Sequence, residues 1–174
     1  MTRFSLRLPQ RQARMVALAV AYHLARPGSE LDRETMQAYE HGLAELPAAL
    51  EPQLEAETAT LELSPLQVTL LATAMSSVLS ELKMYSVFDT MAGESDRPRS
   101  TAHGFDERLR GLFPEIAADP TVADDLAGEM TMLRRELPLG RARQRLEEAD
   151  ARRERSAAEE GERAGKKRWQ FWKR

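Results

Sequence analysis

The longest uninterrupted helical pattern in the chain begins at Ser64 and runs to about Thr90. Ser64 and Gln67 have the spacing of a capping box, and Pro65 takes the first helical position, where a missing N–H is tolerated. Apolar residues then recur at spacings of three and four: Leu66, Leu70, Leu71, Ala74, Met75, Val78, Leu79, Leu82 and Tyr85. Small residues replace charges over part of the outward face, at Thr73, Ser76 and Ser77. Because a helix with so little charged surface is normally buried, we expect it at the centre of the fold.

The same order of strand, proline and apolar helix occurs at the N-terminus. Residues 4–8 and 58–63 alternate apolar and polar side chains, which is the period of a half-buried strand. Pro9 begins a helix that runs to about Ala25, with an apolar face of Met15, Val16, Ala19, Val20 and Tyr22. Its outward face is small or apolar at Ala17, Leu18 and Ala21. We expect the two helices to pack on each other, with the two strands adjacent.

Three further helices are predicted. Ser29 is a candidate N-cap for a helix that ends near Leu46, and Pro47 and Pro52 interrupt the segment after it. Residues 105–118 predict a short helix, bent or interrupted near Pro114. The next helix has a clean apolar stripe of Val122, Leu126, Met130, Leu133 and Leu137.

The chain changes character after residue 138. From Arg141 to Arg163, Leu146 is the only large apolar side chain. Opposite-charge pairs such as Glu148 and Arg152 support a helix there, but the pattern shows no face to bury.

These patterns predict a mainly α fold, in which a compact helical domain has a small two-stranded β element and a charged C-terminal helical extension. We expect the helical domain to cover residues 1–138, with short strands near 4–8 and 58–63. Residues 139–164 form a charged extension, helical or disordered, and residues 165–174 a basic aromatic docking tail.

Charge is distributed unevenly along the 174 residues. Residues 1–140 contain 13 Lys and Arg against 21 Asp and Glu, whereas residues 141–174 contain 12 against 7. Segregation of this kind concerns partners more than fold. The absence of cysteine excludes disulfides and thiolate metal sites and suits the cytoplasm, where we expect the protein.

Motifs of catalysis are missing from the sequence. It has no phosphate-binding glycine loop, no Gly-x-Ser-x-Gly and no His-Glu-x-x-His. The histidines His23, His41 and His103 are far apart, and no spacing between them is typical of metal ligands. We therefore expect no catalytic, cofactor-binding or metal-binding residues, and a protein that is not an enzyme.

The C-terminal tail contains both tryptophans of the chain. Its aromatic residues lie among cations, and together they are the predicted partner-binding residues: Trp169, Phe171, Trp172, Lys166, Lys167 and Arg168. Tryptophan usually goes into a core or an interface because it buries a large area. We expect the tail to bind another protein, with nucleic acid and an anionic membrane surface as the other candidate targets.

The first forty residues resemble the ribbon-helix-helix family of Arc-type DNA-binding proteins. The resemblance rests on the segment Arg3-Phe-Ser-Leu-Arg-Leu-Pro9, a helix, Pro27-Gly28 and a second helical segment up to Tyr39. It implies a strand that pairs with its twin in a homodimer and inserts alternate side chains into the major groove. By position, Arg3, Ser5 and Arg7 would face DNA, and Ser29 would lie where helix N–H groups hold a phosphate.

Two function classes therefore stand beside each other. The first is a non-catalytic interaction module, such as an adaptor, scaffold component or regulatory subunit, that docks through the basic aromatic tail. The second is a dimeric ribbon-helix-helix-type transcriptional regulator. The sequence leaves open whether the N-terminal strand pairs within the chain or across a dimer.

Overall fold

The computed structural model describes residues 3–26, 42–91 and 104–171, and describes their side chains except at 86–91 and 160–171. The elements are, in chain order, β1 (Phe4–Pro9), α1 (Gln10–Ala25), η1 (Leu43–Glu45), α3 (Leu46–Leu50), η2 (Glu51–Gln53), β2 (Thr58–Leu63), α4 (Pro65–Met91), α5 (Phe105–Leu112), η4 (Pro114–Ala117), α6 (Val122–Glu136) and α7 (Leu139–Phe171). The fold is mainly α with one two-stranded antiparallel sheet, which confirms the predicted fold class. Most of the helix predicted from Ser29, with His41 and His103, lies outside the described residues.

Helix α4 lies at the centre of the molecule, as its sequence predicts. Its capping box is formed: the Ser64 N–H donates to Gln67 Oε1 at 2.9 Å, and the Gln67 N–H donates to Ser64 Oγ at 3.2 Å. The helix contacts α1, α6 and α7, and Leu71, Met75 and Val78 are fully buried between them. Burial on several sides explains why the helix has so few charges.

The sheet pairs β1 with β2 within the chain, in an antiparallel register that places Leu6 opposite Leu61. Ala59, Leu61 and Leu63 are buried under the sheet, whereas alternate residues of both strands are exposed. The predicted alternation is therefore confirmed. Residues 10–57 connect the two strands. Because Phe4 lies opposite Leu63, the pairing also brings the start of β1 beside the start of α4.

The segment between α1 and β2 differs from the expectation that its prolines interrupt helical structure. Pro47 stands in the first turn of α3 and Pro52 in the first turn of η2. Proline is tolerated at these positions because the first N–H groups of a helix have no intrahelical partner. The two prolines thus begin short helical turns, and Leu43, Leu46 and Leu50 of this segment are buried against the core.

Helices α5 and α6 pack against α1, and α6 also packs against α4. Helix α5 ends before Phe113, and η4 begins at Pro114, so the predicted interruption is confirmed. Phe105 is fully buried and meets the Tyr22 ring edge-on, with 5.4 Å between the ring centroids. Phe113, just after the end of α5, is also buried, with 1% of its surface exposed.

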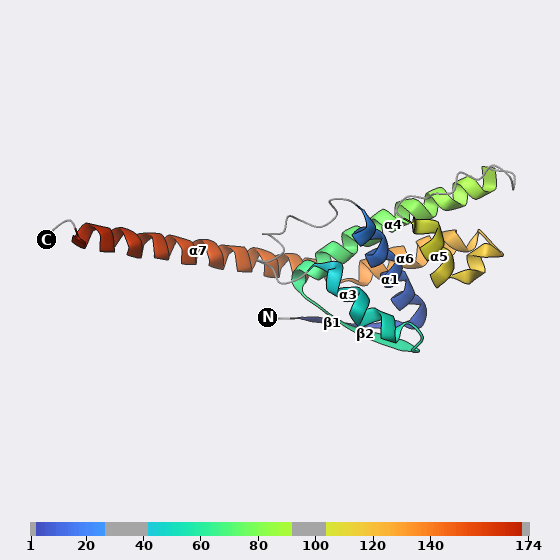
Figure 1. Ribbon diagram of the computed structural model, residues 1–174, viewed down its shortest axis with the longest axis horizontal. Coiled ribbons are helices and arrows are strands. Elements are labelled where there is room, and N and C mark those ends of the chain that lie inside the picture. Colours follow the sequence, from blue (N-terminus) through green and yellow to red (C-terminus); the bar gives the residue numbers. More distant parts are fainter. Residues whose placement is uncertain (1–2, 27–41, 92–103, 172–174) are drawn as a thin grey trace.

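Helix α7 begins in the core and then leaves it (Figure 1). Leu139, Ala142 and Leu146 repeat at spacings of three and four along the part of α7 that contacts α4, and Ala142 is fully buried. The expectation that residues beyond 140 have no face to bury is wrong for these first turns, because a short Ala–Leu stripe suffices to pack on a helix. The packed part of the chain therefore continues about ten residues past the expected end of the domain at 138.

Candidate functional site

The predicted docking residues belong to the far end of α7. The backbone of Lys166 to Phe171 is helical, their side chains lie outside the described part, and Trp172 lies beyond the described residues altogether. Between them and the packed turns, every side chain from Ala151 to Glu159 is exposed. This part of α7 projects away from the rest of the molecule (Figure 1). We call residues 151–171 the arm.

The arm is helical, and its described side chains, from Ala151 to Glu159, form no buried face. Its start is supported by pairs one turn apart: Arg152 lies 4.0 Å from Glu148, as the sequence predicts, and Arg153 lies 3.9 Å from Asp150. Each such pair stabilises a helix by only about 0.2–0.5 kcal/mol. With a rise of 1.5 Å per residue, the arm carries the end of α7 about 30 Å from the packed turns.

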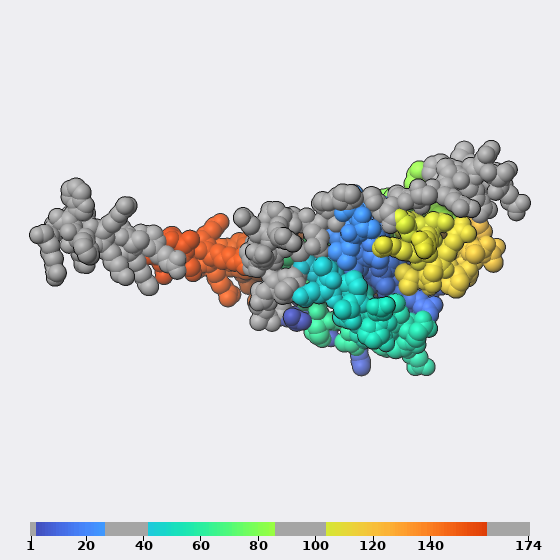
Figure 2. Space-filling view, in the orientation of Figure 1, coloured from blue at the N-terminus to red at the C-terminus, as the bar shows by residue number. Residues whose placement is uncertain are grey.

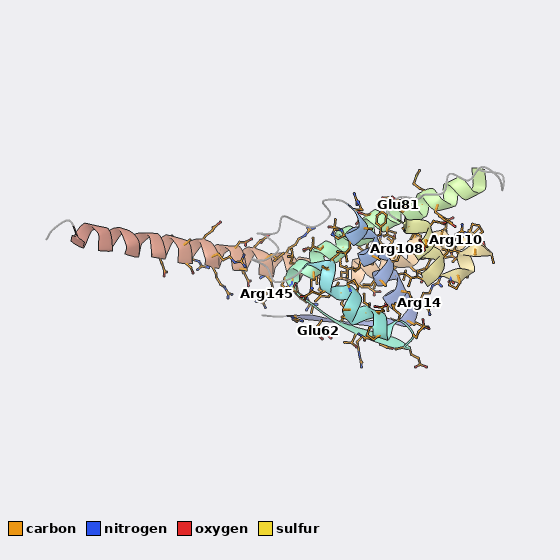
Figure 3. All side chains as sticks on the ribbon, in the orientation of Figure 1. Arg14, Glu62, Glu81, Arg108, Arg110 and Arg145 are labelled. Carbon is orange, nitrogen blue, oxygen red and sulfur yellow. The ribbon has the colours of Figure 1, made fainter. Side chains whose placement is uncertain are left out.

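The second predicted site, on β1, forms part of a polar sheet face. Arg3, Ser5 and Arg7 are exposed, and Thr58, Thr60 and Glu62 extend the same face on β2. In the described part of the chain, neither Arg3 nor Arg7 forms an ion pair. Glu62 lies opposite Ser5, so an acidic group shares the face with the two arginines (Figure 3). Ser29 lies outside the described residues.

Two other N-terminal arginines have structural partners. Arg11 of α1 binds Glu129 of α6 at 2.9 Å and Glu115 of η4 at 2.8 Å. Although partial burial opposes it, these two carboxylates raise the pKa of Arg11. At Glu115, partial burial tends to raise the pKa of the carboxyl group. A backbone hydrogen bond and the neighbouring Arg11 outweigh this effect, so the pKa of Glu115 is lowered. Arg14 binds Glu55 at 3.0 Å. Part of the basic N-terminus is therefore neutralised within the fold.

A polar cluster closes the C-terminal end of α1. The Tyr22 hydroxyl donates to Glu81 Oε1 at 2.5 Å, and Arg26 lies over the Tyr22 ring, 5.9 Å from its centroid. Burial and the Glu81 carboxylate raise the pKa of Tyr22 to about 12. Tyr22 is therefore neutral at ordinary pH, and its hydrogen bond to Glu81 joins α1 to α4.

An apolar groove crosses the outward face of α1. Its floor is made by Ala17, Val20 and Ala21 of α1. One wall comes from α3, η2 and the residue after η2: Pro47, Leu50, Glu51 and Leu54. The other wall comes from α5: Arg108, Gly111 and Leu112. The groove has a volume of about 440 Å³, and Figure 2 shows α1 (blue) at the surface between α3 (cyan) and α5 (yellow).

Arg108 is held at the edge of this groove. Its Nη1 donates to the backbone carbonyl of Ala21 at 2.6 Å, which fixes the guanidinium above the end of α1 (Figure 3). Glu51 stands on the opposite wall, and both side chains are exposed. The groove thus combines an apolar floor with one cation and one anion at its edges, which is the composition of a binding surface for an amphipathic group.

Neither a metal-binding cluster nor a membrane-spanning helix occurs among the described residues. Among the described side chains, no group of three or more His, Asp and Glu is placed to hold a metal ion. None of the described helices is both long enough and apolar enough to cross a membrane. Comparison with family models, curated proteins and solved structures finds no match to this chain.

The sequence prediction missed the groove, although one sequence feature pointed there. The outward face of α1 is small at Ala17 and Ala21, a pattern that by itself indicates a buried helix. In the structure Leu18 is indeed buried, but Ala17 and Ala21 are partly exposed and form the groove floor. The walls come from segments about 30 and 90 residues further along the chain, which helical periodicity does not connect.

Proposed function

We propose that this protein is a non-catalytic interaction module that attaches to a partner through its C-terminal tail. The observation that supports this best is the exposed arm, which extends the docking residues away from the packed body (Figure 1). A helical extension that does not pack on the core is typical of a segment that presents a binding site to a partner. A protein of this kind acts as an adaptor, scaffold component or regulatory subunit, and we place it in the cytoplasm.

The composition of the tail specifies how it attaches. Trp169, Phe171 and Trp172 lie within four residues of one another, and a few large aromatic anchors dominate the energy of most interfaces. Lys166, Lys167 and Arg168 precede them and steer the approach to an acidic partner, with an effect that weakens in salt. The aromatic residues therefore set the lifetime of the complex and the basic residues set its rate of formation.

Affinity capture with an N-terminal tag tests the proposal, because this tag leaves the tail free. The variant Trp169→Ala with Trp172→Ala is expected to lose the bound partners while the body keeps its thermal unfolding midpoint. The matched control, Trp169→Phe with Trp172→Phe, keeps aromatic anchors and is expected to retain most of the binding. Replacement of three basic residues by Ser is expected to slow association and to make its rate less dependent on salt. These residues are Lys166, Lys167 and Arg168. Equal recovery of the same partners by the alanine variant would refute the proposal.

A second candidate is a DNA-binding regulator of the ribbon-helix-helix type. The supporting observation is the exposed polar face of the two-stranded sheet, because a ribbon of two strands fits the major groove of B-DNA. Here β2 occupies the position of the twin strand, and Glu62 adds an acid to the face that would meet DNA. If Arg3 and Arg7 face DNA bases in the major groove, replacing both by Ala will weaken binding and, because two cations near the phosphates are lost, reduce its salt dependence. Binding to duplex DNA that is unchanged by this double replacement would rule the candidate out.

A further inference from the structure

The apolar groove on α1 has no occupant among the described residues, and its composition suits the tail of this chain. Its floor, where Ala17 and Ala21 are partly exposed beside the buried Val20, accommodates rings of the size of tryptophan, since about 440 Å³ is within the range of ligand-binding clefts. Leu54 and Leu112 extend the apolar surface on the two walls. The tail, with three aromatic residues in four positions, is an apolar segment whose side chains do not belong to the described core.

Charge also matches between groove and tail. Residues 43–57, which supply one wall, contain four glutamates and no cation. Glu55 of this set pairs with Arg14, and Glu51 stands at the groove edge. Residues 165–174 contain five cations and no acid. Arg108, on the other wall, is fixed by its hydrogen bond to Ala21 in a position where its guanidinium can stack on an aromatic ring.

The tail of the same chain is not placed to fill this groove. Helix α7 is continuous from Leu139 to Phe171. Figure 1 shows the far end of α7 well away from α1, α3 and α5. A contact between tail and groove therefore requires two molecules.

We propose that the segment Trp169–Trp172 of one copy docks in the α1 groove of a second copy. This inference rests on the proposed function of the tail and names its partner as this same chain. The contact is heterologous, because two different surfaces meet, so it closes into a ring or continues as an open chain. The protein is then a self-assembling scaffold. Salt is expected to weaken its assembly, because salt screens the attraction between the tail cations and the glutamates on the groove wall.

Glycine supplies a way to block the groove without disturbing the core. A side chain at Gly111 would meet no atom within 4 Å of its Cβ, and the residue lies on the groove wall in α5. Gly111→Leu is expected to fill the groove and to favour the helix. Gly128→Leu is the matched control, because Gly128 is exposed in α6, has the same free space and does not line the groove.

Light scattering on full-length chains tests the proposal in two stages. The unchanged protein and Gly128→Leu are expected to show an apparent mass that rises above one chain with concentration. Two variants, each measured by itself, are expected to stay at the mass of one chain. One is Gly111→Leu, and the other is Trp169→Ala combined with Trp172→Ala. An equimolar mixture of these two variants is expected to recover a two-chain species, since one supplies an intact tail and the other an open groove.

The outcomes separate this inference from the proposed function. A full-length protein that stays monomeric at every concentration overturns the inference, and tail-dependent capture of another protein would still support the proposed function. Assembly that persists in Gly111→Leu, or a mixture that fails to pair, also overturns it, because the groove is then not the acceptor. The tryptophan variant could lose both assembly and capture of partners while Gly111→Leu keeps both. The surface that accepts the tail would then lie outside the groove.

Discussion

Helices α4 and α7 are the two longest in the described part of the chain, with 27 and 33 residues, and they are stabilised in different ways. Helix α4 is covered by α1, α6 and α7, and residues such as Leu71 and Met75 are completely buried. Helix α7 shares that environment only in its first turns, and its side chains from 151 to 159 are all exposed. Helix α4 is held by burial, and the arm is held by local charge pairs and backbone hydrogen bonds.

This difference separates folding from binding along the chain. A packed helix unfolds with the whole domain, whereas an exposed helix opens locally at little free-energy cost. Substitutions in α4 should therefore change the stability of the protein, and substitutions in the arm should change binding alone. Variants in the two regions test this separation, in order of decreasing effect on the free energy of unfolding.

The largest effect is expected at the centre of α4. Leu71→Ala removes a fully buried side chain and leaves a cavity, so it should lower the free energy of unfolding by about 2–5 kcal/mol. Chemical denaturation measures the change. The comparison is Arg155→Ala in the arm, which should stay within about 0.5 kcal/mol of the unchanged protein. Similar losses in the two variants would mean that the arm is packed.

The boundary between body and arm gives the next effect. A chain that ends at Pro138 loses the burial of Ala142 and the partial burial of Leu139 and Leu146, which should cost about 2–3 kcal/mol. A chain that ends at Ala151 keeps these contacts and should unfold at the same midpoint as the full chain. Calorimetry on the two truncated chains checks both statements, and a lowered midpoint for the longer one would contradict the boundary.

A smaller effect is expected for the ion pairs of α1. Arg11→Ala should cost about 0.2–1 kcal/mol in chemical denaturation, since its two carboxylate partners are partly exposed. Arg7→Ala, at an exposed position with no ion pair in the described part, should cost nothing measurable.

The pH dependence of this difference depends on Glu115. Because its pKa is lower in the folded protein, the stabilisation is present above the ordinary value of 4.5 and is lost as pH falls through the folded value. The gap between Arg11→Ala and the unchanged protein should therefore narrow in acid. A gap that is constant from neutral pH to below this range would show that Arg11 acts through packing on Phe113 instead.

The smallest effect on the body is expected from a break in the arm. Ala157→Pro should reduce the helical content seen by far-ultraviolet circular dichroism, because proline removes a hydrogen bond and clashes inside a helix. The unfolding midpoint of the body should not change. Ala157→Leu, which preserves the helix, is the control, and a lower midpoint in the proline variant alone would show that arm and body are coupled.

The sequence predicts the fold where local chemistry decides it. Ser64 and Gln67 have the spacing that fixes the start of α4, and the alternation around Leu6 and Leu61 is visible in each strand separately. The packed turns of α7 escape prediction because Ala142 is small, and its burial depends on α4 rather than on its own hydrophobicity. Arg11 and Glu129 are 118 residues apart, and no local pattern connects them.

The two candidate sites also differ in whether local sequence or tertiary packing determines them. The tail is apparent because Trp169 and Trp172 are close together in the sequence, so composition alone indicates it. The groove combines α1, α5 and the turns around Leu50, and its existence depends on how three distant segments pack. A surface built in this way can be recognised only after the tertiary structure is known.

Hydrogen exchange tests the separation of body and arm most directly. It is best measured residue by residue on the Trp169→Ala, Trp172→Ala variant, which lacks the docking tryptophans. We predict that amides of Arg143 to Ala149 exchange as slowly as those of Leu71 to Leu82, through global unfolding. Amides from Arg155 to Phe171 should exchange far faster, through local opening of an exposed helix. Equal protection along the whole of α7 would contradict the separation, because the arm would then be part of the folded body.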